Sequence, residues 1–246
     1  MGLKCILIVG SVFCFTMLKA QNQKPLIVDN IKVELGNLSY GDYSFSMERK
    51  IATKSSLSLR LGYLQPFNHL LNKYDINLSG DKTGFDTSLE YRFFLLGKQK
   101  DKLLGFYAAP YFRYANLSLN FLDEIQISPF SVALNYSNIG AGIQLGVQGR
   151  LNGDGNSNSF LNHIIYDFHL LGGGIDWHKL SMKYQAMKNP DEYDYGQIED
   201  DIRGYFDKYP ILNRKLQFGY LSNKLGVTLP LVLPGLRAGF SIGYQF

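Results

Sequence analysis

Short segments of this chain alternate strictly between apolar and polar residues, and this pattern constrains the fold more than any other feature. The last eleven residues show it most clearly. Because successive side chains of a strand point to opposite faces, residues 236–246 predict a strand with one apolar and one polar face. The apolar face carries Leu236, Ala238, Phe240, Ile242, Tyr244 and Phe246. The polar face carries Arg237, Gly239, Ser241, Gly243 and Gln245.

The same alternation recurs upstream and predicts eight strands. We place them near residues 30–38, 42–51, 56–65, 84–95, 104–118, 132–150, 162–176 and 236–246. Most are about as long as a tilted strand must be to cross a bilayer, and the chain is rich in Tyr and Phe, with 17 of each. The expected fold is therefore all-β: a transmembrane, antiparallel, up-and-down β-barrel. A hairpin formed by 215–220 and 224–229 would give ten strands; these two segments could instead extend the barrel wall.

The connections between the predicted strands suggest an orientation. Residues 52–55 and 97–102 form short links, and 152–162 form a looser one. The alternate connections at 65–83, 119–131 and 177–235 are longer. Outer-membrane barrels have short periplasmic turns and longer external loops, so we expect both termini in the periplasm of a Gram-negative bacterium.

The first 20 residues have the order of a secretory signal peptide. Met1–Lys4 is basic, Cys5–Leu18 is almost entirely apolar, and Ala20 precedes a polar run. An uncleaved anchor is the alternative. The expected mature domain is 21–246, a single barrel that includes the long external loop 177–235. Both cysteines lie in the signal segment, so we expect neither disulfides nor thiolate metal sites in the domain. Its near-neutral charge gives no argument for nucleic acid as a partner.

Charged residues on the polar faces are predicted to fill the barrel interior. Glu48 and Arg60 lie at equal distances from the turn after residue 51, so we expect them to face each other as an ion pair. An eight-stranded barrel is filled by its own side chains or holds one small ligand. We expect a salt-bridged plug; a gated proton or ion path and a small-ligand cavity are the alternatives. The predicted interior charges are Glu48, Arg60, Glu90, Arg92, Arg113, Asp167, His169 and Arg237.

The last external connection contains a predicted amphipathic helix over residues 197–209. The apolar and aromatic residues that fall at helical spacing are Ile198, Ile202, Tyr205, Phe206 and Tyr209, and Pro210 ends the pattern. We expect this acidic helix to lie over the barrel mouth or against neighbouring loops. The alternatives are a docking surface for a protein partner and a cation site.

Motifs for catalysis, cofactor binding and metal binding are missing from the sequence. Near the predicted rim, His178 and Ser181 lie three residues apart with Asp176 nearby, but strand positions three apart face opposite sides. There is no zinc-protease motif and no phosphate-binding loop. We therefore predict no catalytic, cofactor-binding or metal-ligating residues.

Three segments resemble a family of small outer-membrane β-barrel proteins common in Bacteroidetes. They are Met47–Lys50 with the hairpin that follows, Tyr107–Tyr114, and Leu233–Phe246. The resemblance implies a barrel in contact with outer-membrane lipid. It also implies that the barrel-assembly machinery reads the final aromatic pattern Phe240, Ile242, Tyr244 and Phe246 during insertion. OmpA and OmpX are similar in architecture only.

Three functions follow as hypotheses. The first is a non-enzymatic barrel that supports the envelope or presents 177–235 to a protein partner. The second is a channel for small solutes or ions. The third is a surface enzyme that modifies lipid.

Overall fold

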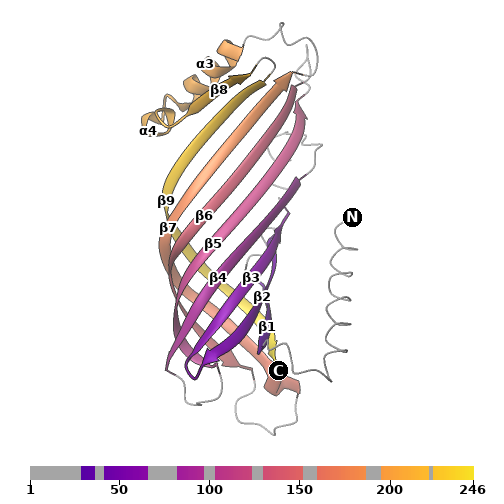
Figure 1. Cartoon of the computed structure of the whole chain (residues 1–246), viewed down its shortest axis with the longest axis vertical. Helices are drawn as coiled ribbons and strands as arrows, with labels where there is room; N and C mark the ends of the chain where they lie inside the picture. The colour runs from indigo at the N-terminus through magenta and orange to yellow at the C-terminus, as the bar shows by residue number, and fades with distance from the viewer. Residues whose placement is uncertain are drawn as a thin grey trace.

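Eight antiparallel strands form a closed ring in the computed structural model (Figure 1). The structure describes residues 29–36, 42–65, 82–96, 103–123, 130–151, 160–186, 195–221 and 224–246. β1 pairs with both β2 and β9, which closes the ring, so the predicted all-β up-and-down barrel is confirmed. The ring strands are β1 (Asn30–Glu34), β2 (Asp42–Ala52), β3 (Ser55–Leu64), β4 (Lys82–Leu96), β5 (Gly105–Asp123), β6 (Phe130–Arg150), β7 (Ile164–Ala186) and β9 (Lys224–Gln245).

The elements outside the ring are short. β8 (Gln217–Leu221) pairs with the start of β9 alone, so the two candidate segments extend the wall and do not add strands to the ring. A 3-10 helix, η3 (Phe160–His163), precedes β7. The predicted helix is present as α3 (Tyr195–Phe206), and Pro210 begins a further turn, α4 (Pro210–Asn213). The predicted signal segment lies outside the described residues.

The wall is low on one side of the barrel and high on the other. β1, β2 and β3 have 5, 11 and 10 residues, whereas β5, β6, β7 and β9 have 19 to 23. The predicted limits at 118, 176 and 236 were therefore wrong, since these three strands extend well beyond them. The first strand is shorter than predicted, because β1 ends at Glu34. Figure 1 shows the long strands rising past the short ones, with α3 and β8 at the far end from the carboxy terminus.

The register around the ring sets the tilt of the strands. From Val33 on β1, a row can be followed around the ring from each residue to its direct partner on the next strand. The row reaches β9 at Val232, whereas Val33 itself pairs with Ile242 of β9. The offset of ten residues corresponds to a strand tilt of roughly 40°. At about 3.3 Å per residue, ten tilted residues rise about 25 Å along the barrel axis. The full row is Val33, Phe45, Leu61, Thr87, Tyr114, Ile139, Trp177 and Val232.

The lower part of the barrel has its polarity reversed relative to a water-soluble protein. Its outward side chains are large, apolar and exposed, and they occur on all eight ring strands. Its inward side chains are polar or charged and buried. We call the outward surface the apolar belt; members include Val33, Tyr43, Leu59, Phe85, Phe112, Ile143, Phe168, Ile175 and Leu236.

The polarity reverses again above the paired residues Tyr114, Ile139, Trp177 and Val232. On β5, β6 and β7, the outward positions above this row are mainly polar: Asn116, Ser118, Asn120, Asn135, Ser137, Lys179, Ser181 and Lys183. The inward positions above it are mainly apolar and include Leu134, Leu180, Met182, Leu225, Val227 and Leu229. We call this upper part the extension.

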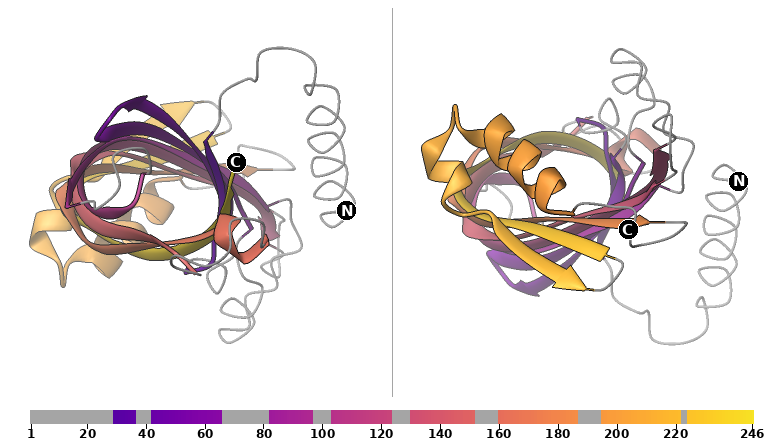
Figure 2. Two further views of the ribbon diagram at one scale, coloured as in Figure 1. Left: turned by 90° about the horizontal axis from the view of Figure 1, so that it is seen from below. Right: turned by 90° about the horizontal axis from the view of Figure 1, so that it is seen from above.

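The helix α3 covers the inward face of the extension. Its apolar residues Ile198, Ile202 and Phe206 pack against a buried cluster formed by Leu216, Leu225, Val227 and Leu229. The two remaining views of the barrel show α3 at the same end as the β8–β9 hairpin (Figure 2). The expected amphipathic helix thus exists, and its main contact is with the strands of the extension.

A charged lumen with two cavities

The lower lumen is filled by a network of buried ionic side chains. Lys32 Nζ lies 2.8 Å from Glu48 Oε2 and 2.6 Å from Asp167 Oδ2. Arg92 donates to the same Asp167 oxygen and to Glu90, the latter at 2.7 Å. Each of these side chains is at most 3% exposed. β1, β2, β4 and β7 each place at least one member on the inward face by strand alternation.

Neutral groups complete the hydrogen bonds of this network. The Tyr107 hydroxyl donates to Asp167 Oδ1 at 2.7 Å, and the Arg92 guanidinium stacks 4.7 Å from the Tyr107 ring centroid. Gln148 accepts a hydrogen bond from Lys32 and donates to the carbonyl of Leu103 at 2.6 Å. A buried charge is tolerated only when it is paired with an opposite charge and its remaining hydrogen-bond donors or acceptors also have partners. We call Lys32, Glu48, Glu90, Arg92, Tyr107, Gln148 and Asp167 the lumen seal.

The predicted pairing of Glu48 with Arg60 is wrong. Glu48 lies opposite Ser58, and Arg60 lies opposite Ser46. The hairpin closes through a two-residue turn, Thr53–Lys54, with an irregularity before Ala52, so the register differs by two residues from the expected one. Both side chains face the lumen, but Glu48 belongs to the seal and Arg60 lies above it.

Three further ion pairs lie above the seal, two formed by Arg60 and one by Arg113. Arg60 pairs with Asp42 and, at 3.2 Å, with Asp86. Arg113 Nε donates to Asp176 at 3.1 Å. Arg237 links the two levels, because it lies 2.8 Å from Glu90 in the seal and 5.2 Å from the Tyr111 ring centroid. All eight interior residues predicted from the sequence, His169 included, therefore face the lumen, but they divide between two levels.

A bulge in β7 decides which of its residues enter the lumen. The pairing with both neighbours shifts between His169 and Gly172, and Leu170 and Leu171 are both exposed on the outside. Inward positions are therefore odd-numbered below the bulge and even-numbered above it. The bulge places Asp176 on the same face as Asp167, and simple alternation along β7 could not have identified both.

Other lumen residues were missed although their pattern was visible. Lys32 and Glu34 alternate with the apolar Ile31 and Val33, and Asp86 alternates with Phe85. The alternation that assigned Glu90 to the barrel interior would have assigned Lys32, Glu34 and Asp86 to it as well. Asp42 is the first residue of a predicted strand, and at that position the alternation did not show which face of the strand its side chain occupies.

The rim residues do not form a nucleophile–base arrangement. His178 Nδ1 lies 2.7 Å from the Tyr136 hydroxyl and 2.9 Å from Asn138 Nδ2. The Ser181 hydroxyl lies 3.3 Å from that of Thr228 on β9. Asp176 is paired with Arg113.

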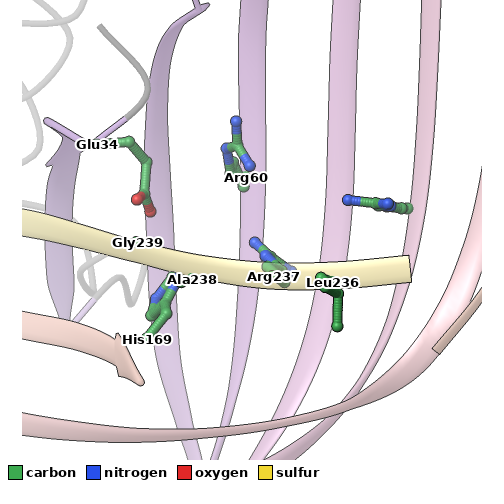
Figure 3. A pocket seen from close by; sticks show the side chains of 8 residues that line it. Glu34, Arg60, His169, Leu236, Arg237, Ala238 and Gly239 are labelled. Carbon is green, nitrogen blue, oxygen red and sulfur yellow. The ribbon is translucent and has the colours of Figure 1, made fainter. Parts of the chain in front are cut away.

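Two cavities adjoin above the seal, since Arg60, Arg113 and Arg237 line both. One has a volume of about 120 Å³ and is also lined by Glu34 and His169 (Figure 3). The other has a volume of about 230 Å³ and extends upward past Asp86, Asn138 and His178. Together they form a polar upper lumen above a filled lower lumen.

The residues of the predicted assembly signal lie on the outward face of β9. The Phe240 ring stacks on Phe168 with centroids 4.5 Å apart, and Tyr244 stacks on His163 at 5.1 Å. Ile242 and Phe246 are exposed.

In the described part of the chain, no three His, Cys, Asp or Glu side chains gather closely enough to hold a metal ion. Among the same residues, no helix is both long and apolar enough to span a membrane. No protein-family model, curated protein or solved structure matches this chain.

Replacement of Asp167 with Asn should destabilise the barrel strongly. The change removes the shared anionic partner of Lys32 and Arg92 and leaves both cations buried. Breaking a buried pair in this way costs about 3–5 kcal/mol of unfolding free energy. Urea unfolding of the refolded barrel measures this quantity. Glu199→Gln, which breaks the more exposed pair with Arg203, is the control and should cost less than about 1 kcal/mol. Equal effects of the two changes would contradict the assigned role of the seal.

Proposed function

We propose that this chain is a non-enzymatic outer-membrane β-barrel protein with a plugged lumen and a surface-interaction role. The observation that carries the proposal is the double change of polarity along the long strands. Below the row at Trp177 the outside is apolar and the inside charged; above it, the outside is polar and the inside apolar. A bilayer around the lower barrel and water around the extension account for both changes.

Dimensions support the same proposal. The low wall at β2 and β3, which have 11 and 10 residues, rises about 25 Å, which is the height of the apolar band in outer-membrane barrels. Trp177 lies at the upper boundary of the belt, where aromatic side chains favour the membrane interface. The strand ends that the short connections join lie at the lower end, so we assign that end, with both termini, to the periplasm. The resemblance to the Bacteroidetes barrel family agrees with this assignment, and residues 1–20 would be its signal peptide.

The buried seal favours a plug over a channel. Arg92 and Tyr107, 1% and 0% exposed, lie across the lower lumen, and no water-filled path is needed to satisfy their hydrogen bonds. The extension holds the α3 region above the belt, because α3 packs against Leu225, Val227 and Leu229. An exposed surface there, formed by Tyr205, Tyr209, Ile211, Tyr220 and Leu221, would be available to a partner.

Membrane insertion predicts a position-dependent cost of arginine. Leu59→Arg places a charge in the middle of the belt and should lower the unfolding free energy by about 2–4 kcal/mol in phospholipid vesicles. Ser137→Arg, outward-facing but above the boundary row, should cost less than about 1 kcal/mol. Urea titration of vesicle-folded protein measures both. A water-soluble barrel would show no such difference between the two positions.

The plug predicts an absence of conductance. Refolded protein in planar bilayers should give no stable single-channel steps. The double variant Arg92→Ala and Tyr107→Ala removes two large side chains of the seal and should produce steps, which also shows that the assay detects inserted barrels. Stable steps from the unaltered protein would support the channel hypothesis and refute the plug.

The surface-interaction role predicts a partner that depends on the α3 region. Cross-linking in intact cells, followed by purification of the tagged barrel, should recover one protein in constant ratio. Tyr205→Ser combined with Ile211→Ser should reduce that recovery about tenfold, equivalent to about 1.4 kcal/mol of binding free energy. Asp200→Ala on the same helix is the control. Recovery that is unaffected by the double change would leave only an envelope-structural role.

A further inference from the structure

In the part of the chain that the structure describes, the barrel wall has an opening beside β9. β1 pairs with β9 only from Asn30 to Glu34, opposite residues 241–245. The amides of Leu35 and Gly36 then donate to the carbonyl of Phe240, at 2.8 and 3.2 Å. Pairing on this side of β9 resumes only at 224–228, with β8. Residues 229–239 therefore have no strand partner on the β1 side within the described chain.

Two prolines keep this edge from pairing. The Phe240 carbonyl faces β1, and alternate residues of a strand direct their backbone groups to the same side. The even-numbered residues from 230 to 238 consequently face the open edge, and they include Pro230 and Pro234. Proline has no N–H to donate and occurs in sheets where an edge is left unpaired. The opening is thus encoded in the sequence of β9.

The smaller cavity lies against this edge. Its lining includes Leu236 and Ala238, whose side chains belong to the outer face of β9, and also Arg237, whose side chain belongs to the inner face. Figure 3 shows Arg237 and Arg60 directed toward each other above β9, with Glu34 at the other end of the cavity. Leu236 is 78% exposed, the largest value on the belt. The cavity therefore lies between the charged lumen and the unpaired edge of β9, next to two residues of the apolar outer face.

The cavity offers unused donors and an unused acceptor. Arg237 Nη1 and Arg60 Nε are buried without a hydrogen-bond partner in the part of the chain that the structure describes. The Arg237 side chain is 7% exposed and is held in place by Glu90. Glu34 is 3% exposed; among the described residues its carboxylate interacts electrostatically with Arg60, and no hydrogen bond to it is found there. Guanidinium groups bind phosphate oxygens, and a carboxylate binds an ammonium group.

We propose that this opening is a lateral portal that admits the head group of a phospholipid bearing an ammonium group. The phosphate accepts hydrogen bonds from Arg237 and Arg60, the ammonium group donates to Glu34, and the acyl chain remains outside against Leu236 and Ala238. The cavity of about 120 Å³ has room for such polar atoms in place of a few water molecules, each of about 30 Å³. The proposal rests on insertion of the apolar belt into a bilayer.

Binding of lysophosphatidylethanolamine to the full-length barrel in an uncharged detergent tests the portal. Calorimetry or native mass spectrometry should show one molecule per barrel. Phosphoethanolamine alone, which has the same head and no chain, should bind at least about tenfold more weakly. Lysophosphatidylglycerol should also bind more weakly, and Glu34→Gln should abolish that difference. Equal binding of the chain-free head would overturn the portal, because the site would then fill from water.

A matched pair of variants separates the portal from the fold. Ala238→Trp fills the mouth of the cavity and should weaken binding at least about tenfold. Ala141→Trp adds the same side chain to an exposed, outward-facing alanine on β6, away from the opening, and should leave affinity unchanged. Heat-dependent electrophoretic migration checks that both variants fold. Unchanged binding by Ala238→Trp would refute the proposal. A barrel that inserts into vesicles but binds no lysophospholipid would refute the portal and leave the membrane proposal standing.

Discussion

Closure of the sheet through β1 and β9 is the constraint on which the rest of the molecule depends. A five-residue strand closes against one of 22 residues, with an offset of ten residues around the ring. That offset sets the tilt and the width of the lumen, and the width leaves room for one layer of inward side chains. The ion pairs of the seal are therefore consequences of closure. Lys32 on β1 reaches Asp167 on β7 because, in the closed ring, β9 alone separates these two strands.

Closure by so short a strand also explains the asymmetry of the barrel. Once β1 ends, β9 continues upward, and in the described chain its residues 229–239 have no strand partner on that edge. Among the described strands, β5, β6, β7 and β8 complete the wall above. Above the belt the sheet is open, so its inward face needs a cover. The helix α3 supplies that cover with Ile198, Ile202 and Phe206. The chain thus has two buried regions of opposite character, an ionic one below and an apolar one above.

This division bears directly on function. Buried ion pairs are rigid when every polar atom has a hydrogen-bond partner, and no buried polar atom of the lumen seal is without one in the described chain. Directly above it, Arg60 and Arg237 retain unused donors beside a cavity that reaches the outer surface. A filled lower lumen beside a polar cavity supports the proposal that the barrel recognises a molecule at its side, in preference to transport through the lumen. The proposed role and the proposed portal both follow from that arrangement.

Alternation of apolar and polar residues determined, without any tertiary information, that this chain forms tilted strands with two unlike faces, that eight of them close a ring, and that charged residues line its interior. It also determined the helix near 197–209, because helical spacing is equally local. The tertiary structure alone decided the partners. A two-residue turn moved Arg60 away from Glu48, and a bulge at Leu170–Leu171 brought Asp176 to the face of Asp167. Register and bulges depend on contacts between strands far apart in the chain, and a period of two is unchanged by a shift of two residues.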